Sequence, residues 1–549
     1  MRLLSRHWRK STWSLVRAPV SLTGFTREGR KTVSSTLGSL LRNAGRRYAN
    51  LPALEIGQVT RTHGELLANG TRLANALLGR GVKPGSFVAA MLEDRVEAIE
   101  TYYAAAIAGY TIVPVNARLQ PTEVSHILAD APVVALIHTE GVVGVLEKSE
   151  LPDTLGSLVA IGNGSLTGGL PYEDLISSAS DVDPCVLIDP EDIAIVGYTS
   201  GTTGLPKGAL CSHRAVVGCT KLVPFIYRVP LHGRLAFPGS ISFVSAMWGV
   251  IFPHLYVGGK IVWTSVDSWF EVLESDRSTF TYAPTPLLPV LTAALEERPS
   301  IMEHLQTILH SASAAPPWML QNLVEVCGDR LLEVWGMTES VSAVTATTLA
   351  DYQGQSEADD VFASVGRPVP TAAVVAVDDD GSSLRRGLEG ELVIESDLMF
   401  SGYLNHPDAT EAVFRGGRYF SGDVGRIDDA GYVYITGRMK DLIISGGANI
   451  YPAELENVLM AMPELTESAV FGVPHEKWGE TPIVAAVRKS GSRITEDQIV
   501  EFLGGRVARY KQPSGVLFVD ALPRNAAMKV QKGELRSWYE TESPPTFLD

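Results

Sequence analysis

The chain has 549 residues, of which 45% are hydrophobic and 20% are charged, and its formal net charge is −16. This length predicts about two to four folding units, and the composition is that of an ordinary globular protein. The negative charge argues against a general nucleic-acid-binding function, and the four cysteines show neither zinc-ligand nor disulfide spacing. A reducing compartment is therefore the default expectation.

The chain opens with a basic extension, which we place at residues 1–31. Residues 1–27 contain six Lys and Arg side chains, several serines and no acidic residue. This composition is typical of an organellar transit peptide or a basic amphipathic segment at a membrane surface. A plain extension of a bacterial enzyme, or a start codon placed too early, is the alternative and is slightly favoured, because composition is the only signal.

Helical and strand patterns alternate through the first two thirds of the chain. Gly64–Arg80 and Arg95–Ala108 have the periodicity of helices, whereas Ser86–Leu92 and Thr111–Val115 are short β-rich runs. Such alternation predicts α/β layers connected by crossover helices.

The stretch Tyr198–Ala209 follows a strand predicted at Asp192–Val196 and has the chemistry of a phosphate-binding loop. It contains four Ser and Thr side chains, three glycines and Lys207. Glycines let backbone N–H groups approach a polyanion, hydroxyls donate hydrogen bonds, and a lysine adds a mobile positive charge. The spacing excludes the P-loop of NTPases. An ordinary surface loop is the less favoured alternative.

The stretch Leu235–Gly259 contains no charged residue and is long enough to span a bilayer. Pro238 and Pro253 interrupt it, however, and serines recur along it. We therefore predict a buried helix lining an apolar pocket in preference to a transmembrane helix.

The last third of the chain predicts a charged linker followed by a small α+β unit of about 110 residues. The linker is Gly437–Asp441. The predicted elements after it are a helix opening at Pro452, strands at Ala469–Val473, Ile483–Arg488 and Val516–Val519, and a helix near Glu496–Leu503.

Five motifs in this order resemble those of the adenylate-forming superfamily, which contains acyl-CoA synthetases, peptide-synthetase adenylation domains and beetle luciferases. They are Tyr198–Ala209, Trp335–Glu339, Ser421–Asp423, Gly437–Asp441 with Gly446–Pro452, and Leu522–Lys529. The resemblance extends from about Thr32 to the end of the chain and favours the AMP-dependent acyl-CoA synthetase branch. It implies an α/β fold, with a large domain of layered α/β subdomains at 32–437 and a small mobile α+β domain at 438–549.

The resemblance also implies individual roles. Trp335 lies against the adenine, Thr338 contacts the α-phosphate, Asp423 and Arg438 bind the ribose, and Lys529 bridges the substrate carboxylate and the α-phosphate. The full set of nucleotide- and CoA-binding residues is Thr199, Ser200, Gly201, Thr202, Thr203, Gly204, Lys207, Trp335, Gly336, Thr338, Asp423, Arg438, Lys529, Gly446 and Gly447. The catalytic residues are Lys529, Lys207, Thr199 and Glu339, of which Glu339 also holds Mg²⁺; Lys440 is the hinge; and the acyl-pocket residues are Ser242, Phe243, Trp248, Ser313 and Ala314.

Four places depart from the family pattern, one of them Ser242, which stands where many relatives carry a histidine or a large aromatic gate. Trp335 replaces the usual tyrosine, which keeps stacking on the base but loses any hydrogen bond from a phenol. Met528 stands where a glycine normally precedes the catalytic lysine, and methionine does not adopt glycine's backbone angles cheaply. Ser311–Pro316 is poorer in glycine than the matching family loop. Lys532 is a competitor of Lys529, although it does not align.

These patterns predict an acyl-CoA synthetase that uses ATP, Mg²⁺ and coenzyme A to activate an apolar fatty or cyclic carboxylic acid. The alternative is a stand-alone ligase that loads a carrier-protein thiol. A hydrolase is disfavoured because no Gly-x-Ser-x-Gly occurs, and a non-catalytic binding protein is disfavoured because the charged motif residues are all present. We expect a monomer or homodimer with no nucleic-acid partner and no membrane span, although the extension offers peripheral membrane contact. We expect a cytoplasmic location, with the mitochondrion as the alternative.

Overall fold

The computed structural model describes residues 35–199, 206–241, 243–354, 358, 360–525 and 529–542. The largest sheet in this part of the chain is mainly parallel, with two antiparallel strands at one edge and one at the other. In spatial order its strands are β16 (Arg367–Pro368), β15 (Ala343–Ala346), β14 (Leu331–Gly336), β13 (Thr307–His310), β12 (Phe280–Tyr282), β10 (Arg234–Phe237), β11 (Lys260–Trp263), β1 (Pro52–Ile56) and β2 (Val59–Thr62).

A second sheet is parallel except for the antiparallel pair β8–β9 at one edge. Its order is β7 (Leu170–Pro171), β6 (Ser157–Ile161), β5 (Val133–Thr139), β3 (Phe87–Met91), β4 (Thr111–Val115), β8 (Ile193–Thr199) and β9 (Lys207–Ser212). The strands predicted at Ser86–Leu92, Thr111–Val115 and Asp192–Val196 are confirmed, and β8 continues further than expected, into the phosphate-loop motif.

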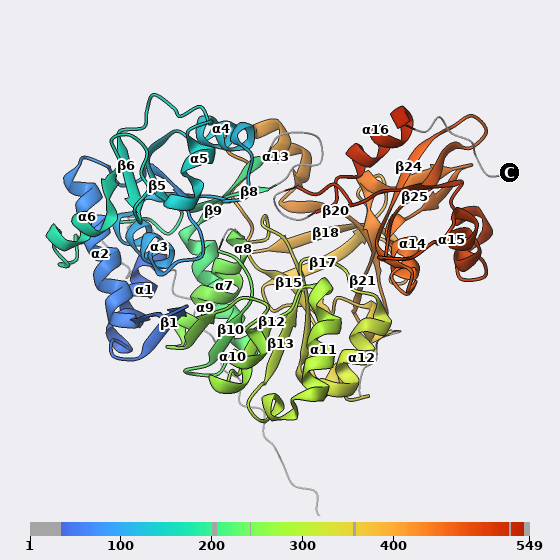
Figure 1. The fold of residues 1–549 in the computed structure, drawn as a ribbon, viewed down its shortest axis with the longest axis horizontal. Helices are drawn as coiled ribbons and strands as arrows, with labels where there is room; N and C mark the ends of the chain where they lie inside the picture. Colours follow the sequence, from blue (N-terminus) through green and yellow to red (C-terminus); the bar gives the residue numbers. More distant parts are fainter. Residues whose placement is uncertain are drawn as a thin grey trace, which may run out of the picture. The chain divides into compact units, whose positions relative to one another are not determined.

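Helices cover these two sheets (Figure 1). They are α1 (Leu37–Arg47), α2 (His63–Gly79), α3 (Val96–Ala108), α4 (Pro121–Asp130), α5 (Val143–Leu146), α6 (Tyr172–Ser178), α7 (His213–Ile226), α8 (Val244–Ala246), α9 (Phe252–Tyr256), α10 (Trp269–Ser275), α11 (Leu288–Glu297) and α12 (Pro317–Cys327). The helices predicted at Gly64–Arg80 and Arg95–Ala108 are α2 and α3. Helix α2 starts at a capping box in which Thr62 and Glu65 bind each other's backbone N–H groups. Every residue of α3 is buried, so this helix belongs to the central core.

A third, antiparallel sheet precedes the predicted linker, beside the short helix α13 (Pro407–Val413). Its strands are β17 (Ala372–Val377), β18 (Gly390–Ser396), β19 (Phe414–Arg415), β20 (Arg418–Ile427) and β21 (Val433–Arg438). The linker is thus partly strand, because Gly437 and Arg438 pair with Val424 and Asp423 at the end of β21. Only Met439–Asp441 forms a short 3₁₀ turn.

The C-terminal part is the predicted small α+β unit, drawn in orange to red in Figure 1. Its strands are β22 (Ile443–Ser445), β23 (Ala448–Ile450), β24 (Leu465–His475), β25 (Gly479–Arg488) and β26 (Gly515–Phe518), and its helices are α14 (Pro452–Leu459), α15 (Glu496–Leu503) and α16 (Lys532–Glu542). Among the described residues, two hydrophobic clusters draw all their members from residue 443 onward. The other three clusters end before residue 439. The cores therefore divide where the linker was predicted.

The prediction of one buried helix over Leu235–Gly259 is wrong in its first half. Leu235–Phe237 belongs to strand β10, and helical structure begins only at Val244, with Phe243 as the residue before it. The helical half consists of α8, a π-helical turn at Met247–Ile251, and α9, and most of it is buried. Uniformly apolar composition suits a buried strand as well as a buried helix. Within the described residues, no helix is long and apolar enough to cross a bilayer.

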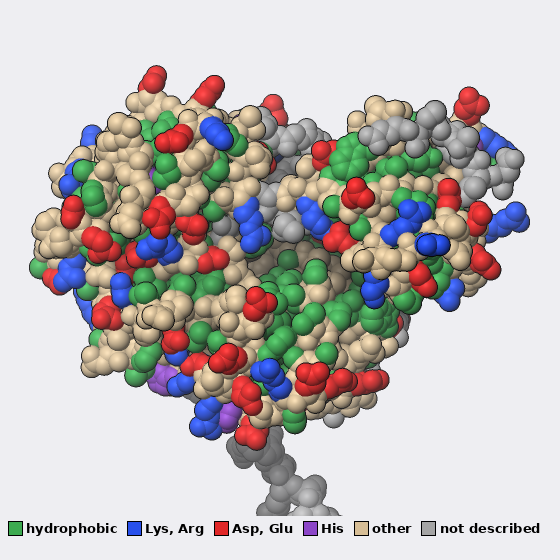
Figure 2. Space-filling view, viewed as in Figure 1, with side chains coloured by type: hydrophobic (Ala, Val, Ile, Leu, Met, Phe, Trp, Pro, Cys, Tyr) green, Lys and Arg blue, Asp and Glu red, His purple; other side chains and the backbone are tan. Residues whose placement is uncertain are grey.

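Acidic and basic side chains are interspersed over the face shown in Figure 2, and no continuous basic stripe is visible there. Hydrophobic side chains gather on this face over α11 and α12 (Figure 2), where Val290 and Trp318 are 46% and 38% exposed.

Candidate active site

Two of the five motifs and two predicted acyl-pocket residues lie at the carboxyl ends of strands in the two large sheets. Thr199 ends β8, Phe243 follows β10, Ser313 follows β13, and Trp335 and Gly336 end β14. In open α/β sheets, ligands bind at this edge of the strands. The structure therefore brings motifs that lie far apart in sequence to equivalent positions in the fold.

The phosphate-loop motif is anchored at both ends. Thr199 and Lys207 face each other across β8 and β9, and the Thr199 hydroxyl donates to the Lys207 carbonyl at 3.5 Å. Beside them, His126 Nε2 donates to the Pro206 carbonyl at 2.9 Å, and the Tyr198 hydroxyl donates to Asp130 Oδ2 at 2.7 Å. Five predicted ligands, namely Ser200, Gly201, Thr202, Thr203 and Gly204, lie outside the described residues.

Close packing at Gly197 connects the phosphate loop to the next motif. A Cβ on Gly197 would lie 2.7 Å from Cγ2 of Thr338 and 3.5 Å from the ring carbon Cη2 of Trp248. At Gly336, a Cβ would lie 2.5 Å from the Ser342 carbonyl oxygen. These contacts leave no room for larger residues at either glycine. They place Thr338 and the indole of Trp248 beside the end of β8.

Asp423 is a buried carboxylate with a partner on each of its two oxygens. It is 2% exposed, Arg438 Nε lies 2.8 Å from its Oδ1, and the indole Nε1 of Trp335 donates to its Oδ2 at 3.0 Å. Burial raises the pKa of Asp423 above its ordinary value of 3.8, although the Arg438 charge and the Trp335 hydrogen bond oppose the shift. The expectation that tryptophan at position 335 costs a hydrogen bond is thus incomplete, because the indole supplies one to Asp423.

Glu339, the predicted magnesium ligand, is buried and held by Tyr403, a residue that sequence reasoning missed. The Tyr403 hydroxyl donates to Glu339 Oε1 at 2.8 Å, and Lys207 Nζ lies 5.6 Å from the centre of the Tyr403 ring. Burial and the Glu339 charge raise the pKa of Tyr403, so this phenol stays protonated. Tyr403 reaches the site from a loop that bridges to Ala209 of β9, a contact that no local sequence signal reveals.

Lys529 lies among the charged residues of the site. Its side chain retains contact with solvent, yet the surrounding protein lowers its pKa below 10.5 through desolvation and the charge of Arg438. Glu339 and Asp423 act on it in the opposite direction. Its competitor Lys532 instead pairs with Glu456, with 2.8 Å between Nζ and Oε1. Met528, the residue in place of the family's glycine, lies outside the described residues.

The predicted acyl-pocket residues differ in their exposure to solvent, and one of them lies outside the described residues. Ser242 lies outside the described residues, Phe243 is half-buried, and Trp248 is 2% exposed within the π-helical turn. Among the described residues, a Cβ on the neighbouring Gly249 would meet no atom within 4 Å, so this part of the structure leaves open space beside the turn. Ser313 and Ala314 are exposed in the loop after β13.

The predicted hinge and CoA-loop residues lie in two successive turns. Lys440 is exposed in the 3₁₀ turn Met439–Asp441, and Gly446 and Gly447 form the two-residue hairpin turn between β22 and β23. Their φ values of +58° and +82° are typical of a turn that glycine favours. Space is restricted only at Gly446, where a Cβ would lie 2.9 Å from the Trp478 ring. At Gly447 the backbone angle, not crowding, accounts for glycine.

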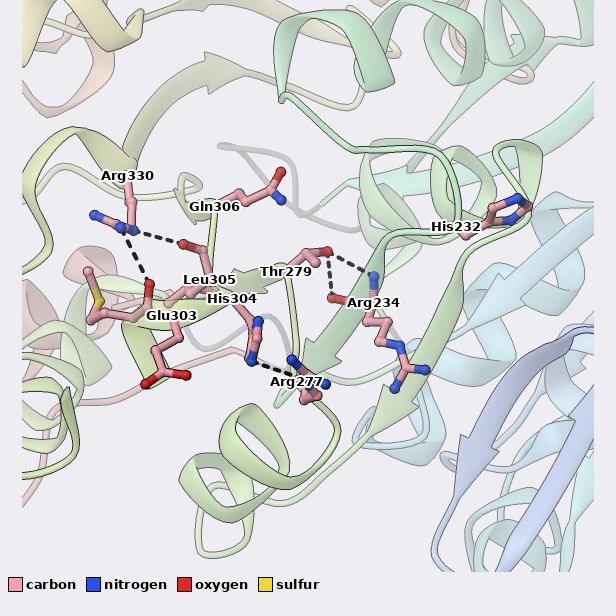
Figure 3. Close-up of a pocket in the computed structure, with 10 residues that line it drawn as sticks. His232, Arg234, Arg277, Thr279, Glu303, His304, Leu305, Gln306 and Arg330 are labelled. Carbon is pink, nitrogen blue, oxygen red and sulfur yellow. Dashed lines mark hydrogen bonds between the residues drawn. The ribbon is translucent and has the colours of Figure 1, made fainter. Parts of the chain in front are cut away.

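A separate cavity of about 440 Å³ lies at the opposite edge of the large sheet (Figure 3). Arg234, Thr279, Gln306 and Arg330 line it where β10, β12, β13 and β14 begin. Its cations already have protein partners: Arg330 donates to the Leu305 and Cys327 carbonyls, and Arg234 pairs with Asp276. This cavity contains none of the predicted site residues.

Comparison with known proteins agrees with this geometry. Residues 41–404 match the family model described as AMP-binding enzyme, and residues 454–529 match the AMP-binding enzyme C-terminal domain. A long-chain-fatty-acid–CoA ligase, FadD13 of Mycobacterium tuberculosis, is 34% identical over 88% of this chain and 94% of its own length. Feruloyl-CoA synthase of an Amycolatopsis species is 31% identical over 91% and 98%.

A solved structure of o-succinylbenzoate CoA synthetase from Bacillus subtilis, in complex with its acyl-adenylate intermediate, has a TM-score of 0.80 and 25% identity. The alignment covers 90% of this chain and 97% of that one. These relatives are bacterial, so they lend no support to the mitochondrial alternative. The chain belongs to the AMP-binding enzyme family and is an AMP-forming acid–CoA ligase, which uses ATP and CoA.

Proposed function

We propose that this ligase activates an apolar carboxylic acid, fatty or cyclic, as an acyl-adenylate and then transfers the acyl group to CoA. The observation that carries the proposal is the electrostatic proximity of Lys529 to Glu339, Asp423 and Arg438. Attack on a nucleotide phosphate requires a cation that offsets the developing negative charge. Here that cation lies beside carboxylates suited to bind a ribose and a metal ion. The relative solved with an acyl-adenylate supports the same intermediate.

In the first half-reaction, a carboxylate oxygen of the acid attacks the α-phosphorus of ATP, and the bond to the bridging oxygen breaks to release pyrophosphate. Lys529 offsets the negative charge shared by the carboxylate and the α-phosphate. Thr199, Lys207, Thr338 and residues 200–204 hold the phosphates. Asp423 accepts hydrogen bonds from the ribose hydroxyls, and Arg438 and Trp335 fix the Asp423 carboxylate for that role.

Glu339 is the proposed ligand of the Mg²⁺ that accompanies ATP. The described residues contain no cluster of three or more His, Cys, Asp or Glu able to hold a metal ion. One carboxylate fits magnesium nonetheless, because this ion is commonly held by one or two carboxylates together with substrate phosphates. Bound there, Mg²⁺ would reduce the repulsion between the phosphates and the incoming carboxylate. Tyr403 orients the Glu339 carboxylate through its hydrogen bond.

In the second half-reaction, the CoA thiol attacks the acyl carbonyl carbon, loses its proton to solvent, and displaces AMP. We propose that the small domain, residues 438–549, turns about Lys440 between the two steps and withdraws Lys529. Gly446 and Gly447 then admit the pantetheine arm. The division of the hydrophobic cores between residues 435 and 443 supports this boundary.

The acyl substrate is proposed from the lining of its pocket. Leu235–Gly259 contains no charged residue, so no arginine there is available to pair with a second carboxylate. Phe243 and Trp248 would form the wall, and the open space beside Gly249 would receive part of the acyl chain. An apolar acid therefore fits better than a dicarboxylate or a free amino acid.

A pyrophosphate-release screen over fatty, aryl and dicarboxylic acids, with and without CoA, tests the proposal. Apolar acids should release pyrophosphate with ATP, and CoA should yield the thioester. A preference for malonate or for free amino acids would contradict the substrate class. Release of pyrophosphate without any thioester would favour a carrier-protein thiol as the acceptor.

A further inference from the structure

A buried chain of hydrogen-bonding side chains lies beneath the loop Ser311–Pro316. The Thr285 hydroxyl is 2.7 Å from the Ser313 hydroxyl and 2.9 Å from His310 Nε2, and His310 Nδ1 is 2.5 Å from Glu333 Oε2. His310 is 0% exposed, Glu333 4% and Thr285 7%. Thr285 opens the 3₁₀ turn that follows β12, His310 ends β13, and Glu333 lies within β14, so the hydrogen bonds connect segments of three neighbouring strands.

The hydrogen bonds have one consistent set of directions when the His310 ring is neutral. In the neutral tautomer that carries its proton on Nδ1, His310 donates to the Glu333 carboxylate, and Nε2 is left as an acceptor. The Thr285 hydroxyl donates to Nε2, and its oxygen then accepts the proton of the Ser313 hydroxyl. The Thr347 hydroxyl accepts from the Glu333 backbone N–H at 2.9 Å, which fixes this position of β14. This series of hydrogen bonds therefore ends at β14 on one side and at the exposed loop Ser311–Pro316 on the other.

The loop that this chain reaches is in a strained conformation. Ala312 has a φ of +76°, in the left-handed region that glycine adopts freely and alanine does not. Ser313, the next residue, contacts Thr285, and His310 at the end of β13 lies two residues before Ala312. A strained backbone persists only where the surroundings hold it, and such strain is concentrated at functional sites.

We propose that Thr285, His310 and Glu333 are positioning residues that hold Ala312 in its strained conformation and so keep Ser313 and Ala314 in place for the substrates. This role rests on the proposed assignment of Ser313 and Ala314 to the substrate pocket. Glu333 also lies two residues before Trp335 on β14. The same hydrogen bonds therefore hold both the loop and the strand that bears the adenine-facing indole. No other described residue of Ser311–Pro316 has a positive φ.

Thr285→Val, alone and combined with Ala312→Gly, tests the role directly. Valine removes the hydroxyl with little change of shape, so the loop should relax out of the strained conformation. We expect KM for ATP or for the acid to rise about tenfold, with a smaller change in kcat. Glycine at 312 adopts a positive φ without strain, so the double variant should return to within about threefold of the wild type.

Thr292→Val is the matched control, because Thr292 donates only to the Leu288 carbonyl within α11. Thr285→Ala removes the same hydroxyl and keeps the test valid if the valine variant does not fold. Normal KM values in Thr285→Val, or a double variant as impaired as the single one, would overturn the positioning role and leave a purely structural one. Absence of acid-dependent pyrophosphate release in the wild type would instead contradict the proposed function.

Discussion

At the scale of single residues, the site is defined by a few charges held in different ways. Asp423 is fixed from both sides by Arg438 and Trp335, whereas Lys529 retains contact with solvent. A rigid carboxylate suits the ribose-binding role proposed for Asp423. An accessible lysine suits the role proposed for Lys529, which is confined to the first half-reaction.

The pH dependence of adenylation follows from the lowered pKa of Lys529. The ammonium is lost as pH rises through its pKa, so the alkaline limb of acyl-adenylate formation should lie below the ordinary lysine value of 10.5. Arginine keeps its charge at any pH in this range. Lys529→Arg should therefore lower kcat but move the alkaline limb upward. Initial rates of pyrophosphate release from about pH 7 to pH 10 test this difference between the wild type and Lys529→Arg. If the rates of both enzymes fall at the same alkaline pH, the role of Lys529 is contradicted.

Trp335→Phe should weaken ATP binding. Phenylalanine keeps a ring against the base but leaves the buried Asp423 without its indole donor, so KM for ATP should rise about tenfold. Trp269→Phe is the matched control, because it removes a comparable buried bond, from Trp269 Nε1 to the Thr281 hydroxyl, in α10. Both variants should lose thermal stability. A rise in KM for ATP of the same size in both would show that the effect is not specific to Asp423.

At the scale of elements, sequence periodicity identified the helices and strands that a single segment defines. It missed the contacts between segments that lie far apart in sequence. The patterns that predicted α2, α3, β3, β4 and most of the C-terminal unit are confirmed, because amphipathic spacing and breakers define them within one segment. Leu235–Gly259 was mispredicted in part, since apolar composition alone does not separate a strand from a helix. Tyr403 and the Thr285–His310–Glu333 chain could not be predicted, because strand pairing assembles them from distant segments.

The π-helical turn at Met247–Ile251 is expected to set acyl-chain length. Trp248→Ala should extend the range of accepted acids, since each additional buried CH₂ contributes about 0.8 kcal/mol. Gly249→Leu adds a side chain to the open space beside the turn and should shorten the range. Profiles of kcat/KM against chain length provide the comparison. If neither profile shifts, both residues are core packing and the acyl chain binds elsewhere.

The 3₁₀ turn Met439–Asp441 is expected to be the hinge. Proline at 440 fixes φ and restricts the preceding residue, so Lys440→Pro should spare adenylation and lower thioester formation at least about tenfold. Lys440→Ala removes the same side chain but keeps the backbone free, and it should retain both activities. Loss of both activities in the proline variant would argue against rotation at this turn.

At the scale of the whole molecule, the ligase family and its α/β fold with a small C-terminal domain were predictable, because the motifs occur in order along the chain. The acyl substrate was not, because the shape of a pocket depends on the packing of side chains from distant segments. The net charge of −16 repels the anionic substrates ATP and CoA. Binding must therefore depend on local cations, of which Lys207, Arg438, Lys440 and Lys529 are the described candidates.

The central claim is that one site serves two half-reactions and that Lys529 serves only the first. Separate assays of Lys529→Ala, for acyl-adenylate formation and for thioester formation from supplied acyl-adenylate, test it most directly. We expect the first rate to fall about 10²- to 10³-fold and the second to stay within about threefold of the wild type. Lys532→Ala, which breaks only the ion pair with Glu456, should leave the first rate intact. Equal loss of both rates in Lys529→Ala, or normal adenylation, would contradict the account.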